Sequence, residues 1–371
     1  MLTLIIFIIV LSVLVFVHEL GHFWVAKRAG MKVEEFGFGF PPRLLAWRRR
    51  PAAEVEPAFG NETTFSINLI PFGGFVKILG EDGGEITDPR SFAAAKPGVR
   101  AAVIVAGVAM NLLLAIVLLS IGNAVGLRVG LADEAARNRA TDIKIQIAQV
   151  AEASPAQEAG LRLLDEISAI TVSGQRLTVG EISEVQNIIN SNRGREITLE
   201  IKRGSETLPI LVIPRANPPP NEGAIGISLA LTGIVEYPWH QAVSQGIQNT
   251  FFITRETIAG YGTILRNLFI TGKAGVELSG PVGIAVITGQ AARLGFIYLL
   301  QLVSLISINL AVLNAAPFPA LDGGRLLFVV IEKLKGRPVS KKIETAVNAA
   351  GFALLIALMI LVTAKDIIKF L

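Results

Sequence analysis

The chain has 371 residues, of which 51% are hydrophobic and only 17% are charged, and its formal net charge is +4. Soluble domains carry charge at about a quarter of their positions, so this composition excludes an ordinary soluble protein and indicates an integral membrane protein with at least one soluble domain. The basic residues cluster at the ends of apolar segments, which disfavours nucleic-acid binding, and the lack of cysteine excludes disulfides and thiolate metal sites.

Four apolar stretches are long enough to cross a bilayer, which takes about 20 helical residues. They cover residues 2–26, 99–124, 296–316 and 347–364. The first stretch has no basic residue before Lys27 and no small-residue cleavage site where a signal peptide would have one. We therefore expect it to be a retained helix.

The first stretch ends in the motif His18-Glu19-Leu20-Gly21-His22, which contains two of the three histidines in the chain. Histidines at positions i and i+4 share one helix face and can bind one metal ion, and the glutamate between them can act on water. At 1.5 Å per residue, His18 lies roughly 24 Å along the helix from Leu2, inside the hydrocarbon core, where ionisable residues are usually functional. The alternative is a set of interfacial polar groups at a helix end.

Lysine and arginine residues predict the orientation of the spans. Lys27, Arg28 and Lys32 follow the first span, together with the triple arginine at 48–50. Between the third and fourth spans lie, among others, Lys333, Lys335, Arg337, Lys341 and Lys342. Because positive residues favour the cytosolic side, we expect both loops in the cytosol, with the N-terminus and the section between spans two and three outside.

Residues 126–216 have the pattern of a soluble domain. Polar and apolar residues alternate over 143–147 and 197–201, which indicates half-buried strands, and residues 154–161 predict a short capped helix that ends at Gly160. A stiff proline-rich linker follows at 217–221.

Residues 239–269 repeat apolar side chains at helical spacing, but interrupting polar residues make the segment too polar to span comfortably. A helix on the membrane surface is the favoured interpretation, and a buried core helix is the alternative.

Two histidines leave a catalytic zinc one protein ligand short. The candidate is Asp322, where the third span reaches the side that carries the histidines. Pro317 and Pro319 break the helix there, and free backbone within a membrane is tolerated only where protein or water satisfies it. A simple turn at 322–324 is the alternative.

The histidine-glutamate-x-x-histidine motif at 18–22 and the asparagine-x-x-proline-x-proline-x-leucine-aspartate-glycine motif that begins at Asn314 resemble those of the site-2 proteases, a family of intramembrane zinc metalloproteases. The resemblance covers essentially the whole chain and is closest to the bacterial group of the regulator of sigma-E protease. It implies His18, His22 and Asp322 as ligands of Zn²⁺. It also implies Glu19 as the catalytic base and Asn314 as a residue that binds substrate or stabilises the oxyanion.

Other segments are also similar to this family. Residues 71–77 resemble its membrane-associated β-hairpin, so Gly73, Gly74 and Phe75 are expected to present an edge strand to an extended substrate; an ordinary interfacial hairpin is the alternative. Residues 280–285 and 106–111 match further family segments, except that Val108 replaces a proline. The 126–216 region resembles a PDZ domain, which would either bind a substrate terminus or act as a size-excluding cover.

The predicted fold class is a polytopic α-helical membrane protein with about four transmembrane helices, an inserted α+β PDZ domain and a membrane-associated β-hairpin. The expected divisions are residues 1–125 with the first two spans, the PDZ domain at 126–216, a linker with the surface helix at 217–295, and the last two spans at 296–371.

The resemblance implies a zinc-dependent intramembrane endopeptidase. Its expected partners are the lipid bilayer, single-span substrates such as trimmed anti-sigma factors or remnant signal peptides, and an upstream site-1-type protease. The bacterial inner membrane is the expected location, with a plastid or thylakoid membrane as the alternative. A non-catalytic PDZ scaffold and a zinc transporter are the rival functions.

Overall fold

The computed structural model describes residues 2–48, 63–81, 84, 87–131, 134–204, 206–219, 222–272 and 280–370. It divides into two compact units, the first formed by Met1–Ile121 with Val243–Leu371 and the second by Gly122–Ala242. Two parts of the sequence predictions fall outside the described residues: Arg49 and Arg50 of the basic cluster, and Pro220 and Asn221 of the linker.

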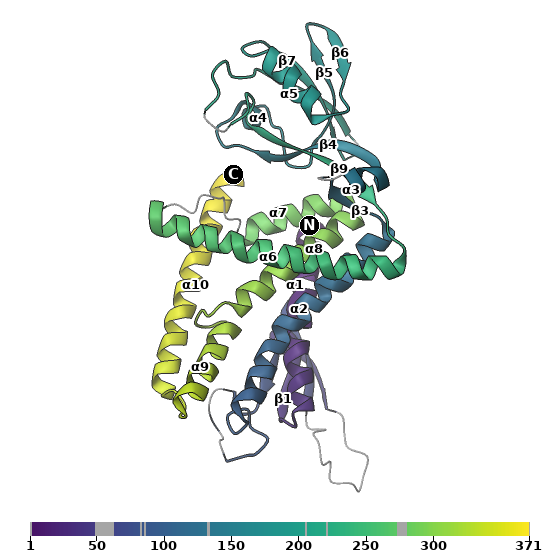
Figure 1. Cartoon of the computed structure of the whole chain (residues 1–371). Helices are drawn as coiled ribbons and strands as arrows, with labels where there is room; N and C mark the ends of the chain where they lie inside the picture. The colour runs from purple at the N-terminus through teal and green to yellow at the C-terminus, as the bar shows by residue number, and fades with distance from the viewer. Residues whose placement is uncertain are drawn as a thin grey trace. The chain divides into compact units, whose positions relative to one another are not determined.

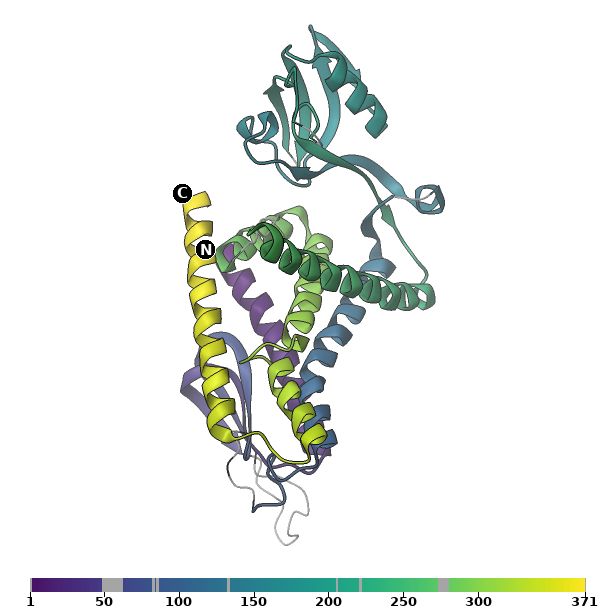
Figure 2. The same cartoon turned by 60° about the vertical axis from the view of Figure 1, so that its left-hand side comes forward.

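Four helices in the described part of the chain are long and apolar enough to cross a membrane, as predicted. They are α1 (Leu2–Arg28), α2 (Pro97–Val125), α8 (Phe296–Ala315) and α10 (Lys341–Phe370). Helices α1, α2 and α8 lie side by side, and α10 lies at the edge of this unit (Figures 1 and 2). Their exposed leucine, isoleucine and phenylalanine side chains suit contact with lipid.

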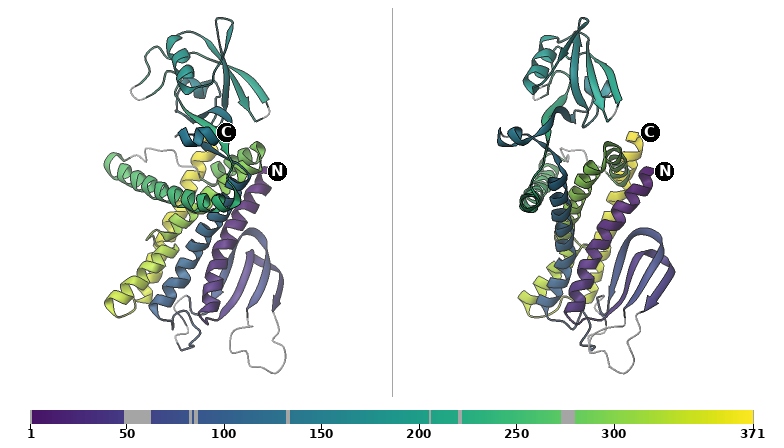
Figure 3. Two further views of the ribbon diagram at one scale, coloured as in Figure 1. Left: turned by 45° about the vertical axis from the view of Figure 1, so that its right-hand side comes forward. Right: turned by 90° about the vertical axis from the view of Figure 1, so that its right-hand side faces the viewer.

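Three more helices belong largely to the first unit: α6 (Trp239–Thr271), α7 (Pro281–Leu294) and α9 (Asp322–Lys335). Helix α6 covers the residues predicted to be helical and runs crosswise to α1, α2 and α10 in Figures 1 and 2, while the right-hand view of Figure 3 shows it nearly end-on. Helix α9 was not predicted, because its 14 residues are too few for a span and its glycines resemble a turn.

Strands β1 (Val33–Arg48) and β2 (Thr64–Ile78) form an antiparallel sheet beside α1 (Figure 3). Both strands fold back, so that Phe36 pairs with Val76 on one side and with Phe65 on the other. The last part of β2, residues 74–78, therefore forms an edge of this sheet among the described strands. This edge runs along the face of α1.

The second unit contains an antiparallel sheet of seven described strands in the order β3-β9-β4-β5-β7-β8, with β6 paired to β5. The strands are β3 (Leu127–Gly130), β4 (Thr141–Val150), β5 (Glu166–Val172), β6 (Gln175–Thr178), β7 (Ile197–Arg203), β8 (Glu206–Val212) and β9 (Ile227–Val235). Short helices α3 (Glu134–Arg139), α4 (Pro155–Glu158) and α5 (Ile182–Ser191) accompany it.

The core of the second unit follows the period-two pattern of its strands. Ile147, Leu199 and Ile201 are fully buried and pack with Val185 and Ile189 of α5. Helix α4 begins as predicted, with the Ser154 hydroxyl accepting a hydrogen bond from the Gln157 N–H at 3.2 Å.

The sheet of the second unit extends beyond the domain boundary that we predicted at residue 216. Strand β9 returns after the proline-rich segment and pairs with both β3 and β4. The boundary is corrected because Ile227 to Val235 belong to the sheet and not to the linker. The compact unit accordingly runs to Ala242.

Candidate metal centre

His18 and His22 lie one helical turn apart on one face of α1, and this face packs against α2. Both imidazoles are buried. The two helices approach so closely that a Cβ on Gly21 would come within 2.4 Å of the Ala106 carbonyl oxygen. Glycine is therefore required between the histidines at this crossing.

Asp322 enters the site from an interruption between α8 and α9. Helix α8 ends at Ala315 and α9 begins at Asp322, which confirms the predicted break at the prolines. A Cβ on Gly323 would come within 2.1 Å of the Ala316 carbonyl oxygen, so this turn requires glycine. The Asn348 amide oxygen on α10 accepts a hydrogen bond from the Ala320 N–H at 3.1 Å and fixes the turn.

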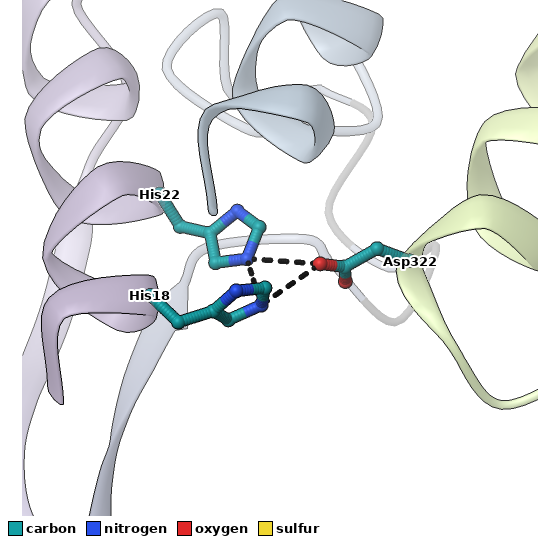
Figure 4. Close-up of side chains that lie close together, drawn as sticks. All are labelled: His18, His22 and Asp322. Carbon is teal, nitrogen blue, oxygen red and sulfur yellow. Dashed lines mark hydrogen bonds and ion pairs between the residues drawn. The ribbon is translucent and has the colours of Figure 1, made fainter. Parts of the chain in front are cut away.

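The two imidazoles and the carboxylate converge on one point (Figure 4). Asp322 Oδ2 lies 3.0 Å from His18 Nε2 and 3.2 Å from His22 Nε2, and the two nitrogens are 3.1 Å apart. Ligand atoms about 2.0–2.1 Å from a tetrahedral zinc lie about 3.3 Å from one another. The three atoms thus have nearly the spacing of one face of a zinc tetrahedron.

The same carboxylate oxygen is buried, and it can pair with the two Nε2 atoms beside it only if an imidazole carries a proton on Nε2; with neutral rings whose Nε2 offers a lone pair, it has no hydrogen-bond donor among the described residues. Burying such a group without a partner is costly, whereas a metal cation would satisfy it. Two imidazoles and one carboxylate form a donor set that suits zinc. The residues present therefore fit a zinc ion.

Helix α2 supplies the groups behind the two imidazoles. The Val103 carbonyl oxygen lies 2.8 Å from His22 Nδ1, and the Asn111 amide lies 3.4 Å from His18 Nδ1. Gly107 lies between these contacts, and a Cβ there would come within 2.4 Å of His22 Nε2. We did not predict a role for these residues. The signal in the sequence was a glycine, Gly107, and an amide, Asn111, on one face of an otherwise apolar span.

Glu19 and Asn314 line a cavity of about 210 Å³ together with His18, Asp322 and Asn111. Glu19 Oε2 accepts a hydrogen bond from the Val76 N–H at 3.0 Å. The structure thus brings both predicted catalytic residues to the cavity beside the three candidate ligands.

A second cavity, of about 600 Å³, follows the edge of β2 and reaches Glu19, His22 and Asp322. Gly74 and Phe75 line it. Gly73 packs instead on α1, where a Cβ would come within 2.6 Å of Val15. Two of the three predicted substrate-binding residues therefore reach this cavity, and Gly73 allows β2 to approach α1.

Ion pairs hold α9 at both of its ends. Arg100 on α2 donates two hydrogen bonds to Glu332, at 2.9 and 3.1 Å, and Arg325 forms an ion pair with Glu81. Val329 packs in a buried cluster with Val103 and Phe92. These contacts fix the helix whose first residue is Asp322.

Comparison with known proteins identifies the class. The profile of peptidase family M50 matches residues 6–358. Zinc metalloprotease RasP of Geobacillus kaustophilus is 31% identical over 447 aligned residues, which cover 98% of this chain and 97% of the relative. A protein of Clostridium perfringens that is named as a zinc metalloprotease by inference is 37% identical over 96% of both chains. A similarly named protein of Nostoc is 35% identical over 97% of this chain and 94% of the relative.

The fold and the site define a multi-pass membrane protein with a candidate metal centre. The chain belongs to peptidase family M50, the site-2 protease family, and is a zinc metalloendopeptidase.

Proposed function

We propose that His18, His22 and Asp322 hold the catalytic zinc and that the protein cleaves single-span membrane proteins within or beside the bilayer. The observation that carries this proposal is that two imidazole nitrogens and one buried carboxylate oxygen lie 3.0–3.2 Å from one another. Their spacing leaves one tetrahedral position open for water or substrate.

A zinc ion held by these residues would supply Lewis acidity toward the scissile carbonyl and would lower the pKa of its bound water toward neutrality. Glu19, at the edge of the same cavity, takes the proton from the attacking water and delivers it to the leaving amine. The Asn314 amide donates to the carbonyl oxygen as that oxygen becomes negative, because it lines the same cavity.

The substrate is an extended peptide that adds to the edge of β2 beside the larger cavity. Gly74 and Phe75 line that cavity with Glu19, so strand addition would bring a backbone carbonyl to the base. A helical transmembrane segment must unwind to bind in this way. We propose that such substrates are anti-sigma factors or remnant signal peptides already trimmed by an upstream site-1-type protease.

The sheet formed by β1 and β2 associates with the membrane through exposed apolar side chains. Leu44, Leu45 and Trp47 of β1 and Leu69 and Phe72 of β2 are exposed, as expected for an interfacial element. Helix α6 lies on the membrane surface, because it combines exposed Phe251, Phe252 and Phe269 with polar residues.

Charge distribution supports the orientation of the chain. The basic residues after α1 and around the junction of α9 and α10 favour an active site that opens to the cytosol, with the second unit on the other side. The membrane is a bacterial inner membrane. We propose that the second unit is a single PDZ domain that excludes large substrates, with binding of a substrate terminus as the alternative.

The decisive experiment compares purified wild-type protein with Glu19→Gln and His18→Ala on a trimmed single-span substrate, with bound zinc quantified in each. Cleavage by the wild type alone is expected, with about one zinc in the wild type and in Glu19→Gln and a strongly reduced content in His18→Ala. Zinc binding without cleavage of any of several trimmed substrates would favour a scaffold or a transporter. Full zinc content in His18→Ala would refute the ligand assignment.

A further inference from the structure

One face of α2 contacts the ring atom Nδ1 of both histidines. Val103, Gly107 and Asn111 are spaced by four residues, so they lie above one another on this face. The His22 Nδ1–H donates to the Val103 carbonyl at 2.8 Å, which leaves Nε2 of the neutral ring with its lone pair toward Asp322. His18 needs a similar acceptor at its own Nδ1.

Asn111 is the group at that position. Its side chain is completely buried, its Nδ2 lies 3.4 Å from His18 Nδ1, and its Oδ1 has no hydrogen-bond partner among the described residues. A neutral His18 that offers Nε2 to a metal carries its proton on Nδ1, so two N–H donors would face each other. Rotating the amide by 180° exchanges atoms of nearly equal size and turns Oδ1 toward that N–H.

We infer that Asn111 is a positioning residue that accepts a hydrogen bond from His18 Nδ1–H through its Oδ1 and so aims Nε2 at the zinc. This inference rests on the proposed zinc site. It removes the donor–donor contact and gives the unpartnered oxygen of Asn111 a donor. Each histidine is then oriented by one acceptor from α2, a backbone carbonyl for His22 and an amide for His18.

The backbone of Asn111 has a separate role, which provides a control. Its carbonyl oxygen accepts a hydrogen bond from the Ser307 hydroxyl of α8 at 2.8 Å. Ser307→Ala removes this link between α2 and α8 without touching the Asn111 side chain. Asn111→Leu keeps the branched shape of the side chain and the backbone link but removes the acceptor, and Asn111→Ala removes the acceptor without adding bulk.

The test measures the zinc dissociation constant by chelator competition, for full-length protein in detergent, together with the absorption spectrum of the cobalt-substituted form. We expect Asn111→Leu to weaken zinc binding about 10- to 100-fold and to change the cobalt spectrum. Asn111→Asp keeps an acceptor and should bind zinc within about threefold of the wild type. Ser307→Ala should leave the dissociation constant and the spectrum unchanged.

Thermal unfolding of the zinc-free proteins verifies folding, and Asn111→Ala replaces the leucine variant if the latter does not fold. Wild-type affinity and spectrum in a folded Asn111→Leu protein would overturn the inference while the zinc site stands, provided that His18→Ala abolishes binding. Equal weakening in the leucine and aspartate variants would also overturn it, because loss of packing would then explain both. A His18→Ala protein that still binds zinc would overturn the proposed site itself.

Discussion

Val76 donates its backbone N–H to Glu19 Oε2 at 3.0 Å, so the edge of β2 directly holds the proposed catalytic base. The hydrogen bond fixes one carboxylate oxygen of Glu19. The other oxygen remains available to accept a proton from water in the adjoining cavity. A change in the position of β2 would therefore also change the orientation of the base.

Val76→Pro removes this N–H while keeping an apolar side chain, and proline is tolerated on an edge strand. We expect kcat to fall about tenfold or more, within the range that general bases contribute, while bound zinc stays at the wild-type level. Steady-state cleavage and zinc analysis measure the two quantities. Val76→Ala, which retains the N–H, is the control. Equal losses of activity in both variants would assign the effect to the side chain.

Gly107→Ala is expected to disrupt the metal centre through sterics alone. A Cβ at this position would lie 2.4 Å from His22 Nε2 and 2.7 Å from His18 Cε1, so the imidazoles must leave their present positions. The affinity for zinc should fall about 10- to 100-fold. Gly98→Ala in the same helix is the matched control, because a Cβ there would meet no heavy atom within 4 Å. Unchanged zinc affinity in Gly107→Ala would contradict the packing described here.

The spans and the candidate metal residues were predictable because their signals are local. Apolar length identifies a span, and the four-residue spacing of His18 and His22 identifies a shared helix face. The break before Asp322 followed from proline chemistry, since proline cannot continue the helical hydrogen bonds.

The supporting contacts of the site were not predictable, because they join residues far apart in sequence. Asn111 lies 93 positions from His18, and Arg100 lies 232 positions from Glu332. Strand β9 was missed for the same reason, since it returns to pair with β3 and β4 after a segment that resembles a linker. Hydrophobic periodicity gives the exposed and buried faces of an element but not its neighbour.

The Arg100–Glu332 pair should contribute both to stability and to the position of Asp322. Both side chains are largely buried, with exposed fractions of 17% and 18%. Arg100→Met leaves the Glu332 carboxylate without its donor and should lower stability by about 1–3 kcal/mol. Thermal unfolding in detergent, in parallel with zinc affinity, measures both effects. The double variant Arg100→Met/Glu332→Met should recover part of the stability. A double variant less stable than either single variant would contradict this account.

The start of α5 should depend on pH through Glu184. Its carboxylate accepts hydrogen bonds from the N–H groups of Gly180 at 2.7 Å and Glu181 at 3.1 Å, and these bonds lower the pKa of Glu184 below its ordinary value. A lowered pKa in the folded state means that the stabilisation is fully present above the ordinary pKa. It is lost progressively as the pH falls from the ordinary pKa through the lower one.

Hydrogen exchange of the full-length protein, corrected for intrinsic rates, should therefore show α5 opening severalfold more often as the pH falls below the ordinary pKa of a glutamate carboxyl, about 4.3. Glu184→Gln lacks the titrating carboxylate, so its α5 protection should vary less with pH than that of the wild type. Exchange in α8, which belongs to the other compact unit, provides an internal reference. The same pH dependence in both proteins would refute the role of Glu184, because another group would then have to carry the titration.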